Sequence, residues 1–447
     1  MIAALEARPN PLFFRLLRIV LIALVLRLIV VGFLYPERLN PDRDHWRFGG
    51  EAGRIARSLV QGKGISSPMF AETGPTAWMT PIYPFLLSLV FRVFGVFTKA
   101  SAICILSLNS LFSALTCLPV FFMGRRTFGE KVAWRAAWTW AFFPYGVYFA
   151  ADFIWPTVLT TLLLAVAFLS GLELENSSRP RVWIRFGLLS GVAAMCDPIV
   201  ITVLPPMGLW MCYRAHRRRA NWPGLALGAA LAFVVVVSPW FVRNYVVFHK
   251  VVPFRGNLGL ELYSGNSADP SQWTKGNLQP SHSEKEWQEY VQMGEMDYMQ
   301  HKRAQAMEFI SSHKGLFLWV SLRRAVYMWT NFWSFDPDYL REEPFDVPAI
   351  FLNTTMSVLA LWGLWVGRRT AGAAMAPYAI ALFCFPVVYY ATHPEDYFRR
   401  PLDPLFVVLG VYAVTAWLQR RNPPQSEDAE SISSGRLISS RDIPSRY

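Results

Sequence analysis

Acidic side chains beside long apolar runs are the first candidates for chemistry in this sequence. Asp44 and Glu51 follow the first apolar run, and Asp152 lies between two later runs, among apolar and aromatic neighbours. Ionisable groups near membrane depth are costly, so each needs a partner or a task. A carboxylate in such a place can take a proton from a hydroxyl group as a general base. The structural alternative is that Glu51 and Asp152 each only cap a helix.

Four arginines form the basic counterpart of these acids on the same predicted side of the membrane. Arginine on the outward side runs against the usual bias of basic residues toward the cytoplasm, so it needs another explanation. The guanidinium fork matches phosphate oxygens and keeps its charge at any physiological pH. The candidate phosphate-binding residues are Arg243, Arg255, Arg399 and Arg400. For Arg399 and Arg400 the alternative is an ion pair with Glu395 or Asp396.

Membrane-spanning helices are the elements that must position these residues. Of the 447 residues, 53% are apolar and only 17% are charged, and the charges cluster between long apolar runs. This pattern indicates an all-α polytopic membrane protein, in which about 20 apolar residues cross the hydrocarbon. Candidate spans lie near 12–34, 101–123, 132–150, 153–171, 184–197, 198–213, 222–242, 347–366, 371–391 and 402–419.

Basic turns between these segments predict the orientation of the chain. If the N-terminus is cytoplasmic, every short arginine-rich turn falls on the cytoplasmic side, as the positive-inside rule requires. The large segments 35–100 and 243–346 then face outward. Two further apolar stretches, 81–97 and 316–333, contain arginine and are predicted to form interfacial or re-entrant helices. If instead both cross, the bundle has about 12 spans, so we expect 10–12 in all.

Three local signals refine this picture. The pair 184–197 and 198–213 is predicted to break at Asp197-Pro198, because proline removes a backbone donor and disfavours helix in the residue before it. Such a break faces protein or water, not lipid. In the first outer segment, 50–61 has the spacing of an amphipathic helix with Arg54 off its apolar face. In the second, a capping box that starts at Ser283 predicts a helix over 284–309.

The chain is therefore expected to have four parts. Residues 1–242 form an N-terminal transmembrane catalytic module that includes outer loop 35–100, and 243–346 form a lid with interfacial helices. Residues 347–421 form the C-terminal transmembrane helices. The polar, Pro- and Ser-rich segment 422–447 is predicted to be a disordered cytoplasmic tail.

Composition also argues against several classes of site. The five cysteines lie in or beside apolar runs without metal-ligand or disulfide spacing. Only scattered acids are visible, so neither a metal nor another cofactor is expected. Lysine and arginine outnumber the acids 43 to 31, but they mark the ends of apolar segments and form no basic domain. A nucleic-acid partner therefore has no support beyond net charge.

Several strings, in order along most of the chain, resemble those of a known family. They are an acid-bearing first outer loop that runs into 55–64, TPIYP at 80–84, GRRTFG at 124–129, PWFVRNY at 239–245, GLELYSGN at 259–266 and YFRRPLDP at 397–404. Together they are similar to GT-C type membrane glycosyltransferases of the protein O-mannosyltransferase and aminoarabinose-transferase superfamily. The resemblance implies a GT-C helical bundle with interfacial helices in the first outer loop.

The sequence departs from the family pattern at two places. The usual first-loop acid would align near Phe48, and the resemblance favours Glu51 over Asp44 as its counterpart. In the late motif, Tyr397 and Phe398 stand where the family commonly has Arg and Tyr. The phosphate role in that motif therefore falls to Arg399 and Arg400.

The resemblance implies an inverting, metal-independent transfer of sugar from a polyprenyl-phosphate donor to a hydroxyl of a glycan, lipid or protein on the outer face of the inner membrane. The rival hypothesis is a transporter or a flippase for lipid-linked sugars. It predicts related halves and polar groups near mid-membrane. No internal repeat is evident, and the acids and arginines gather at one face. A scaffold protein is a third alternative, but it leaves the outward arginines unexplained.

Overall fold

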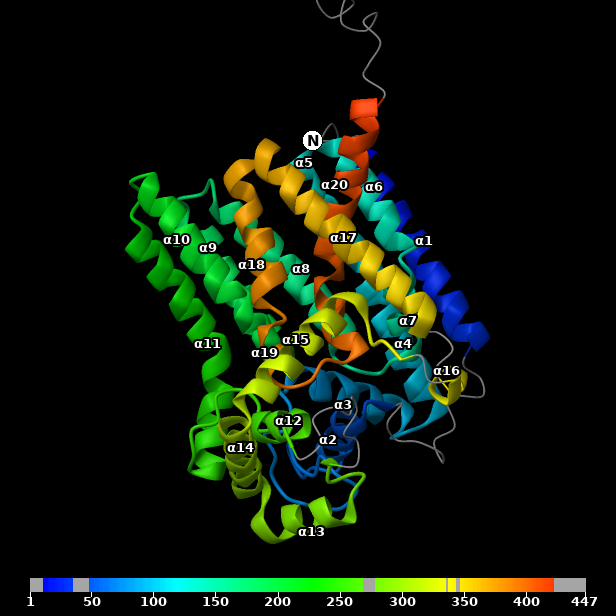
Figure 1. Cartoon of the computed structure of the whole chain (residues 1–447), viewed down its shortest axis with the longest axis vertical. Coiled ribbons are helices and arrows are strands. Elements are labelled where there is room, and N and C mark those ends of the chain that lie inside the picture. The colour runs from blue at the N-terminus through cyan, green and yellow to red at the C-terminus, as the bar shows by residue number, and fades with distance from the viewer. Residues whose placement is uncertain (1–10, 35–47, 268–277, 335–336, 343–345, 422–447) are drawn as a thin grey trace, which may run out of the picture.

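A computed structural model describes residues 11–34, 48–267, 278–334, 337–342 and 346–421. Throughout these ranges the regular structure is helical, and the single β-bridge joins Ser66 and Pro75. Long helices run side by side in a bundle, and shorter helices gather at one of its ends (Figure 1). This confirms the predicted all-α class.

The bundle is built from helices in two stretches of the chain. The first stretch holds α1 Pro11–Leu34, α4 Lys99–Leu115, α5 Cys117–Phe128, α6 Glu130–Ala141, α7 Pro144–Asp152, α8 Thr157–Leu174, α9 Pro180–Cys196, α10 Leu204–Arg217 and α11 Trp222–Phe248. The second holds α17 Asp346–Thr370, α18 Ala376–Cys384, α19 Val387–Ala391 and α20 Asp403–Arg421. Because α20 packs on both α17 and α6, the C-terminal helices close the bundle against the first stretch.

Among the described residues, seven helical segments are long and apolar enough to cross a membrane. They are Pro11–Phe33, Lys99–Phe128, Thr157–Leu174, Trp222–Phe248, Asp346–Thr370, Gly372–Ala391 and Asp396–Arg421, and each overlaps a predicted span. The other three predicted spans are shorter or interrupted helices. Segment 132–150 is divided between α6 and α7, while 184–197 and 198–213 correspond to α9 and α10.

Helices α8 and α20 lie at the centre of the bundle. Of their most apolar stretches 72% is buried, against only 22% for α11, which exposes apolar side chains on the outside. The 3₁₀ segment Asp396–Leu402 leads into α20 and packs against α8. The late arginine motif is therefore held by the most deeply buried part of the fold.

The predicted break at Asp197-Pro198 is confirmed. Helix α9 ends at Cys196, a 3₁₀ turn covers Pro198–Thr202, and α10 begins at Leu204. The Asp197 carboxylate accepts a hydrogen bond of 3.3 Å from the Ile199 N–H and so caps the turn. The break lines a cavity inside the protein, as expected for backbone groups that do not take part in helical hydrogen bonds.

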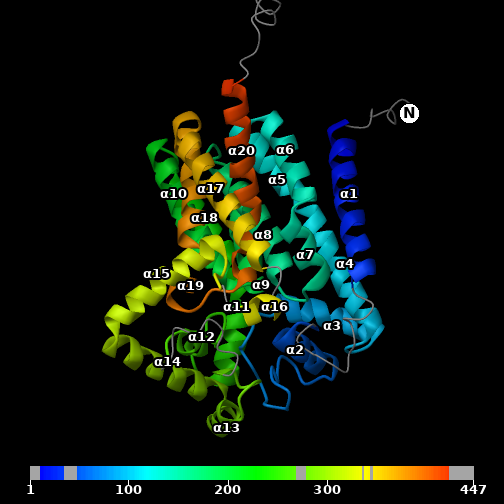
Figure 2. The same ribbon diagram turned by 45° about the vertical axis from the view of Figure 1, so that its right-hand side comes forward.

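Seven helices of 6 to 18 residues cover one end of the bundle. They are α2 Gly50–Val60, α3 Ile82–Phe94, α12 Leu258–Gly265, α13 Glu284–Met293, α14 Glu295–Ser312, α15 Lys314–Thr330 and α16 Pro337–Glu342. Helix α3 lies across the ends of the long helices (Figure 2). Its 13 residues reach only about 20 Å, less than the roughly 30 Å of a hydrocarbon core. Its length supports the predicted interfacial position.

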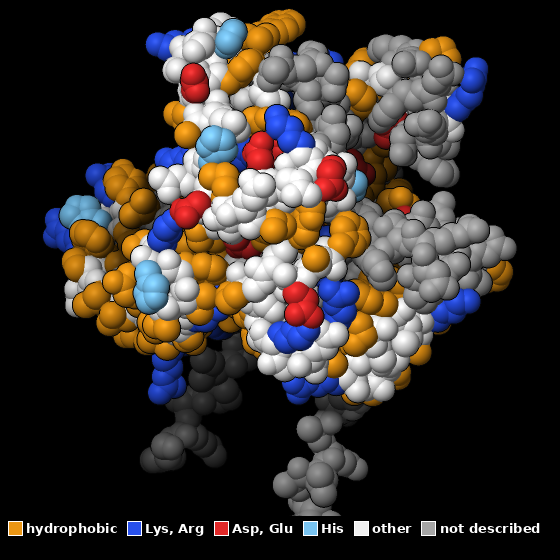
Figure 3. All heavy atoms as spheres, turned by 90° about the horizontal axis from the view of Figure 1, so that it is seen from below, with side chains coloured by type: hydrophobic (Ala, Val, Ile, Leu, Met, Phe, Trp, Pro, Cys, Tyr) orange, Lys and Arg blue, Asp and Glu red, His pale blue; other side chains and the backbone are white. Residues whose placement is uncertain are grey.

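The two ends of the bundle carry different elements. The start of α1 and the end of α20 lie at the end opposite α2 and α12–α14 (Figure 1). Seen from the end that carries the short helices, acidic, basic and histidine side chains stand among apolar patches (Figure 3). This separation agrees with the predicted alternation, in which both termini share one side of the membrane.

Two local predictions are wrong. The helix over 284–309 is divided at Gly294, whose φ of +74° ends α13 and starts α14. The capping box does begin α13, since Ser283 accepts from the Glu286 N–H. Arg54 is buried, not on an exposed face of α2, because its guanidinium reaches a backbone carbonyl of the adjoining loop, the Pro68 oxygen at 2.5 Å.

A buried arginine in α1 is a feature that sequence analysis missed. Arg27 is fully buried and donates to the carbonyls of Ala141 at 2.9 Å and Gly146 at 3.2 Å, and to the Ser113 hydroxyl. The Ala141 carbonyl is open because α6 ends at this residue. Arg27 therefore fastens α1 to the C-terminal end of α6 and to the first turn of α7.

Candidate active site

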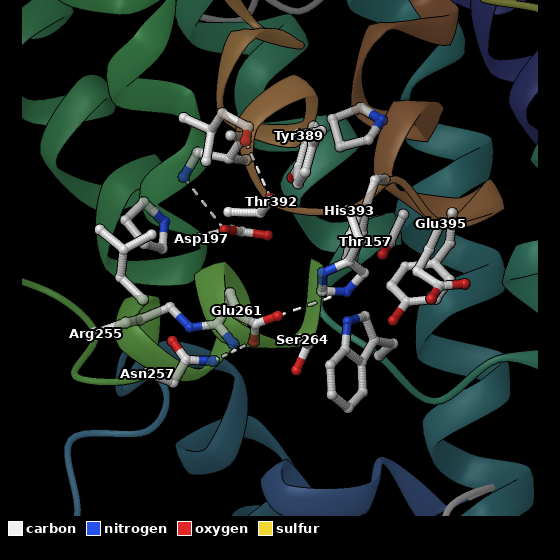
Figure 4. A pocket seen from close by; sticks show the side chains of 18 of the residues that line it. Thr157, Asp197, Arg255, Asn257, Glu261, Ser264, Tyr389, Thr392, His393 and Glu395 are labelled. Carbon is white, nitrogen blue, oxygen red and sulfur yellow. Dashed lines mark hydrogen bonds and ion pairs between the residues drawn. The ribbon is translucent and has the colours of Figure 1, made fainter. Parts of the chain in front are cut away.

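A cavity of about 940 Å³ lies where the short helices meet the bundle. Its walls come from segments far apart in sequence: 148–157 around the start of α8, the break at 197–202, the segment 253–264, and 388–401 before α20. Figure 4 shows side chains from these segments pointing toward a common space. A cavity of this size and mixed lining is typical of a ligand site.

One wall of the cavity is polar and carries Arg255. The Arg255 Nε donates to the Trp78 carbonyl at 3.0 Å, and within the described ranges no carboxylate lies within ion-pair distance of the guanidinium. Its charge still acts on the carboxylates of Glu51 and Asp197. Arg255 is thus a cavity-lining cation whose remaining N–H groups are available to an anionic ligand.

A row of three polar side chains adjoins Arg255. Asn257 donates to Glu261 Oε1 at 2.7 Å, and Glu261 Oε2 lies 3.5 Å from His393 Nε2 (Figure 4). The second ring nitrogen of His393, Nδ1, is buried and has no hydrogen-bond partner. Burial lowers the pKa of His393, Glu261 opposes that shift, and the Arg324 charge adds to it. Burial therefore favours the neutral form of the His393 imidazole.

The opposite wall is aromatic. Phe153 packs on Tyr397 with ring centroids 5.1 Å apart, and Tyr389 stacks on Phe398 at 4.5 Å. Glu395 lies beside this wall, and burial, with a contribution from Asp396, raises its pKa to about 8. The wall therefore offers flat apolar faces next to a carboxyl group that is protonated at neutral pH.

The predicted catalytic acids have different positions. Glu51, in the first turn of α2, is 7% exposed and does not line the cavity. Its Oε2 is buried without a hydrogen-bond partner, and desolvation raises its pKa against the opposing charges of Arg54 and Arg255. Asp152 ends α7, half-buried, next to cavity-lining Phe153. Asp44 lies outside the described residues.

Arg243 binds the first outer segment and does not line the cavity. Its guanidinium donates to the carbonyls of Thr76 at 2.7 Å and Ile65 at 2.8 Å. Glu295 of α14 accepts from the Ala77 N–H and the Thr76 hydroxyl in the same region. Arg243 and Glu295 together hold the 65–77 loop between α11 and α14.

Arg399 and Arg400 lie buried beneath the cavity-lining residues Phe398 and Pro401. Arg400 Nη1 is 3.2 Å from the Asp403 carboxylate, and Arg399 Nε is 3.6 Å from it. Arg399 Nη1 also donates to the Trp329 carbonyl at 3.0 Å and to the Ser357 hydroxyl at 2.9 Å. Arg400 Nη2 donates to Asn353, and its guanidinium lies 3.6 Å from the centre of the Tyr145 ring. The carboxylate that pairs with both is therefore Asp403, which sequence analysis did not single out.

Sequence analysis did not identify the cavity residues Glu261 and His393, although both lie in or near motifs that resemble those of the family. Glu261 belongs to the 259–266 string, and His393 comes four residues before the 397–404 string. Nothing in the local sequence indicates that the two strings meet. In the described part of the chain, no group of three His, Cys, Asp or Glu side chains has an arrangement that could hold a metal ion.

Comparison with known proteins gives one family match. Residues 78–242 match the family model described as dolichyl-phosphate-mannose-protein mannosyltransferase. The matched region runs from the start of the α3 segment into α11 and contains Asp152 and Asp197, but it leaves out Arg255, Glu261 and His393. No curated protein sequence is significantly similar.

Solved structures give a likeness of the whole fold. The oligosaccharyltransferase of Archaeoglobus fulgidus, in complex with Zn and sulfate, matches at 15% identity and a TM-score of 0.53, over 95% of this chain and 51% of that one. The same archaeal enzyme, AglB, with an inhibitory peptide and a dolichol-phosphate, matches at 14% and 0.52, over 97% of this chain and 53% of that one. The chain thus spans about half the length of these proteins.

A bacterial structure matches more loosely. ArnT from Cupriavidus metallidurans, bound to undecaprenyl phosphate, matches at 13% identity over 89% of this chain and 77% of that one. Its TM-score of 0.40 is too low for the two sites to be compared. The family match and the archaeal likeness confirm the resemblance to GT-C type glycosyltransferases that the sequence strings indicated, and they confirm the fold class.

Proposed function

We propose that this chain, whose fold is that of the GT-C type glycosyltransferases, is a membrane enzyme that transfers a sugar from a polyprenyl-phosphate donor to an acceptor hydroxyl. The transfer is inverting and needs no metal, and it takes place on the outer face of the inner membrane, with both termini in the cytoplasm. The acceptor is a glycan, a lipid or a protein. The orientation rests on the arginine-rich turns, which lie at the end of the bundle opposite α2 and α12–α14.

The observation that carries this proposal is the composition of the cavity. It joins an unpaired arginine, several carboxyl groups and a wall of aromatic rings within about 940 Å³. A lipid-phosphate sugar needs these three surfaces: a cation for its phosphate, polar partners for its hydroxyls and apolar faces for its ring and prenyl chain.

Arg255 is the proposed direct contact for the donor phosphate, because it lines the cavity and has N–H groups without a protein carboxylate. Arg399 and Arg400 contribute from beneath the cavity floor. Their two positive charges face one carboxylate, Asp403, so the buried group retains net positive charge below the leaving phosphate. In a site with little water that charge acts over a longer range than in solvent. Arg243 acts by holding the 65–77 loop.

The chemical step is a direct displacement. The acceptor oxygen attacks the anomeric carbon, the bond from that carbon to the phosphate oxygen breaks, and polyprenyl phosphate leaves with the bonding electrons. A base takes the hydroxyl proton. The predicted carboxylates for that role are Glu51, Asp152 and Asp44. Glu51 is buried, and desolvation raises its pKa, which brings proton exchange closer to neutral pH.

Sugar transfer in membranes tests the proposal. Membranes carrying the wild type, Glu51→Gln or Asp152→Asn receive extracted polyprenyl-phosphate donors with labelled sugar, and label in endogenous acceptors is measured. We expect transfer by the wild type and a collapse in the variant that lacks a critical carboxylate. If the correctly folded and inserted wild type transfers no sugar from any donor, the enzyme proposal is wrong and the transporter hypothesis is favoured.

A further inference from the structure

Four acidic side chains line the cavity in the described part of the chain: Asp197, Glu261, Glu395 and Asp396. Asp197 accepts a hydrogen bond from the Ile199 N–H and so serves the 3₁₀ turn. Burial raises the pKa of Glu395 to about 8, so this group carries a proton at neutral pH. Asp396 is exposed to solvent. Glu261 is therefore the half-buried carboxylate that remains for a ligand inside the cavity.

The Glu261 carboxylate is both accessible and oriented. Its side chain is 27% exposed, and Figure 4 shows it between Arg255 and His393 in the cavity. Its Oε1 accepts from Asn257 Nδ2 at 2.7 Å, and Asn257 is itself buried. Its Oε2 lies 3.5 Å from His393 Nε2, which is too far for a strong hydrogen bond. Because each carboxylate oxygen has two lone pairs, Glu261 can accept further hydrogen bonds from a ligand.

Close packing at both ends of α12 fixes the position of Glu261. A Cβ atom at Gly265 would overlap the Thr392 carbonyl oxygen, and one at Gly259 would overlap the Met299 carbonyl oxygen of α14. Only glycine allows these backbone contacts. Helix α12 is therefore held between α14 and the turn that contains Thr392. A ligand that binds Glu261 meets a carboxylate that is already in place, which reduces the entropy lost on binding.

The sugar of a lipid-phosphate donor lies beside its phosphate, because a single bond joins the anomeric carbon to a phosphate oxygen. Arg255, the proposed phosphate contact, and Glu261 belong to the same segment of the cavity wall, 253–264. Their charges also act on a common neighbour, since Arg255 lowers and Glu261 raises the pKa of Glu51. A phosphate held by Arg255 therefore places the sugar ring next to Glu261.

We propose that Glu261 determines which sugar the cavity accepts: its carboxylate accepts hydrogen bonds from hydroxyl groups of the donor sugar, and Asn257 positions it. The inference rests on the proposed function and names the residue that recognises its substrate. Hydrogen bonds to a charged acceptor are stronger than those between neutral groups, so a sugar with free hydroxyls gains affinity. A sugar that carries its own carboxylate would bring two negative charges together in a site with little water. Acidic sugars are therefore rejected.

Binding of prenyl phosphates with and without a sugar to the detergent-solubilised full chain tests this inference. The probes are farnesyl phosphate and farnesyl phosphates that carry glucose, galactose, mannose, arabinose or glucuronic acid. The wild type should bind at least one neutral-sugar lipid more tightly than farnesyl phosphate, and the glucuronic acid lipid more weakly. Glu261→Gln should reduce the preference for the neutral sugar about 10- to 100-fold without weakening farnesyl phosphate binding. A glutamate with a purely structural role would weaken the binding of both lipids.

Three further variants keep the test decisive. Glu261→Asp withdraws the charge by one methylene, so it should lose preference for the neutral sugar and still reject glucuronic acid. In Glu261→Gln that rejection should weaken, because the repelling charge is gone. Asn257→Ala leaves the carboxylate without its hydrogen-bond donor and should show a smaller loss of preference. Glu308→Gln, at an exposed position of α14, should bind every probe like the wild type. If Glu261→Gln does not fold, Glu261→Asp and Asn257→Ala decide.

The outcomes separate the inference from the proposed function. A wild-type preference for a neutral-sugar lipid that is lost in Glu261→Gln supports both. If the folded variant keeps this preference, or if the wild type prefers glucuronic acid or no sugar at all, the role of Glu261 is overturned and the enzyme proposal still stands. If the folded wild type binds none of these lipids, the proposed function itself is overturned, because its donor is not bound.

Discussion

The arginine of the cavity wall and the arginines beneath the cavity have the same side chain but differ in ion pairing. Arg399 and Arg400 share Asp403 and spend further N–H groups on Asn353, Ser357 and backbone carbonyls. Arg255 has one backbone carbonyl as its protein acceptor in the described structure. Buried guanidinium groups that are paired hold a fold together, whereas one left open at a cavity is prepared for a ligand.

The largest expected effect comes from breaking the paired group. Asp403→Asn leaves two buried guanidinium groups with too little negative charge, which should cost about 3–5 kcal/mol of unfolding free energy. Unfolding of the detergent-solubilised protein measures this. Asp297→Asn is the matched control, because it removes an exposed ion pair with Lys250, which is expected to contribute less than about 1 kcal/mol. Equal small losses in both variants would contradict the structural role of Asp403.

A smaller effect is expected from removing the open arginine. Arg255→Gln should keep the fold and weaken binding of a polyprenyl-phosphate analogue about 10- to 100-fold, because a charge-assisted hydrogen bond is worth roughly 1.5–3 kcal/mol. Arg255→Lys keeps the charge without the fork and should bind with intermediate affinity.

The competing outcome for Arg255 is specific. If folded Arg255→Gln binds the analogue like the wild type, while Arg399→Ala or Arg400→Ala loses binding, direct phosphate contact belongs to the buried pair. The two sets of arginines would then exchange the roles assigned to them above.

The sequence predicts the architecture better than the site because the two depend on different signals. Spans and the Asp197-Pro198 break follow from hydropathy and from proline chemistry, which act locally along the chain. The contact between Glu261 and His393 joins residues 132 positions apart, since 393 minus 261 is 132, and it depends on α12 meeting the 391–393 turn. No periodicity in a single sequence carries that information.

Burial caused the other differences between sequence and structure. Arg54 was expected on an exposed face, but a nearby carbonyl allows it to be buried. Glu395 and Asp396 were expected as alternative partners of Arg399 and Arg400. Both arginines pair instead with Asp403, which follows Arg400 by three residues and Arg399 by four. Sequence spacing shows which groups can meet, whereas the tertiary packing decides which of them do.

A third effect is expected where α12 contacts the turn that contains Thr392. In Gly265→Ala, the new Cβ would overlap the Thr392 carbonyl, so α12 must move away from the turn. We expect a loss of about 1–3 kcal/mol in unfolding free energy, as for overpacked sites, and a loss of sugar transfer as Glu261 shifts in the cavity wall. Gly315→Ala is the control, because a Cβ there meets open space. If Gly265→Ala transfers sugar at the wild-type rate, the contact between α12 and the turn at Thr392 tolerates displacement.

The smallest expected effect is on the pH dependence of the unfolding free energy. Burial raises the pKa of Glu395 from an ordinary 4.5 to about 8, so between these values the folded protein holds a proton that the unfolded chain has released. Unfolding free energy should therefore fall as pH rises from about 4.5 to about 8, because the folded state binds more protons. Glu395→Gln removes the titration and should flatten this decline. Glu308→Gln, at an exposed position of α14, should leave it unchanged. An unaltered slope in Glu395→Gln would mean that the cavity already stabilises the charged carboxylate, and that its aromatic wall is wetter than the packing of Tyr397 and Phe398 implies.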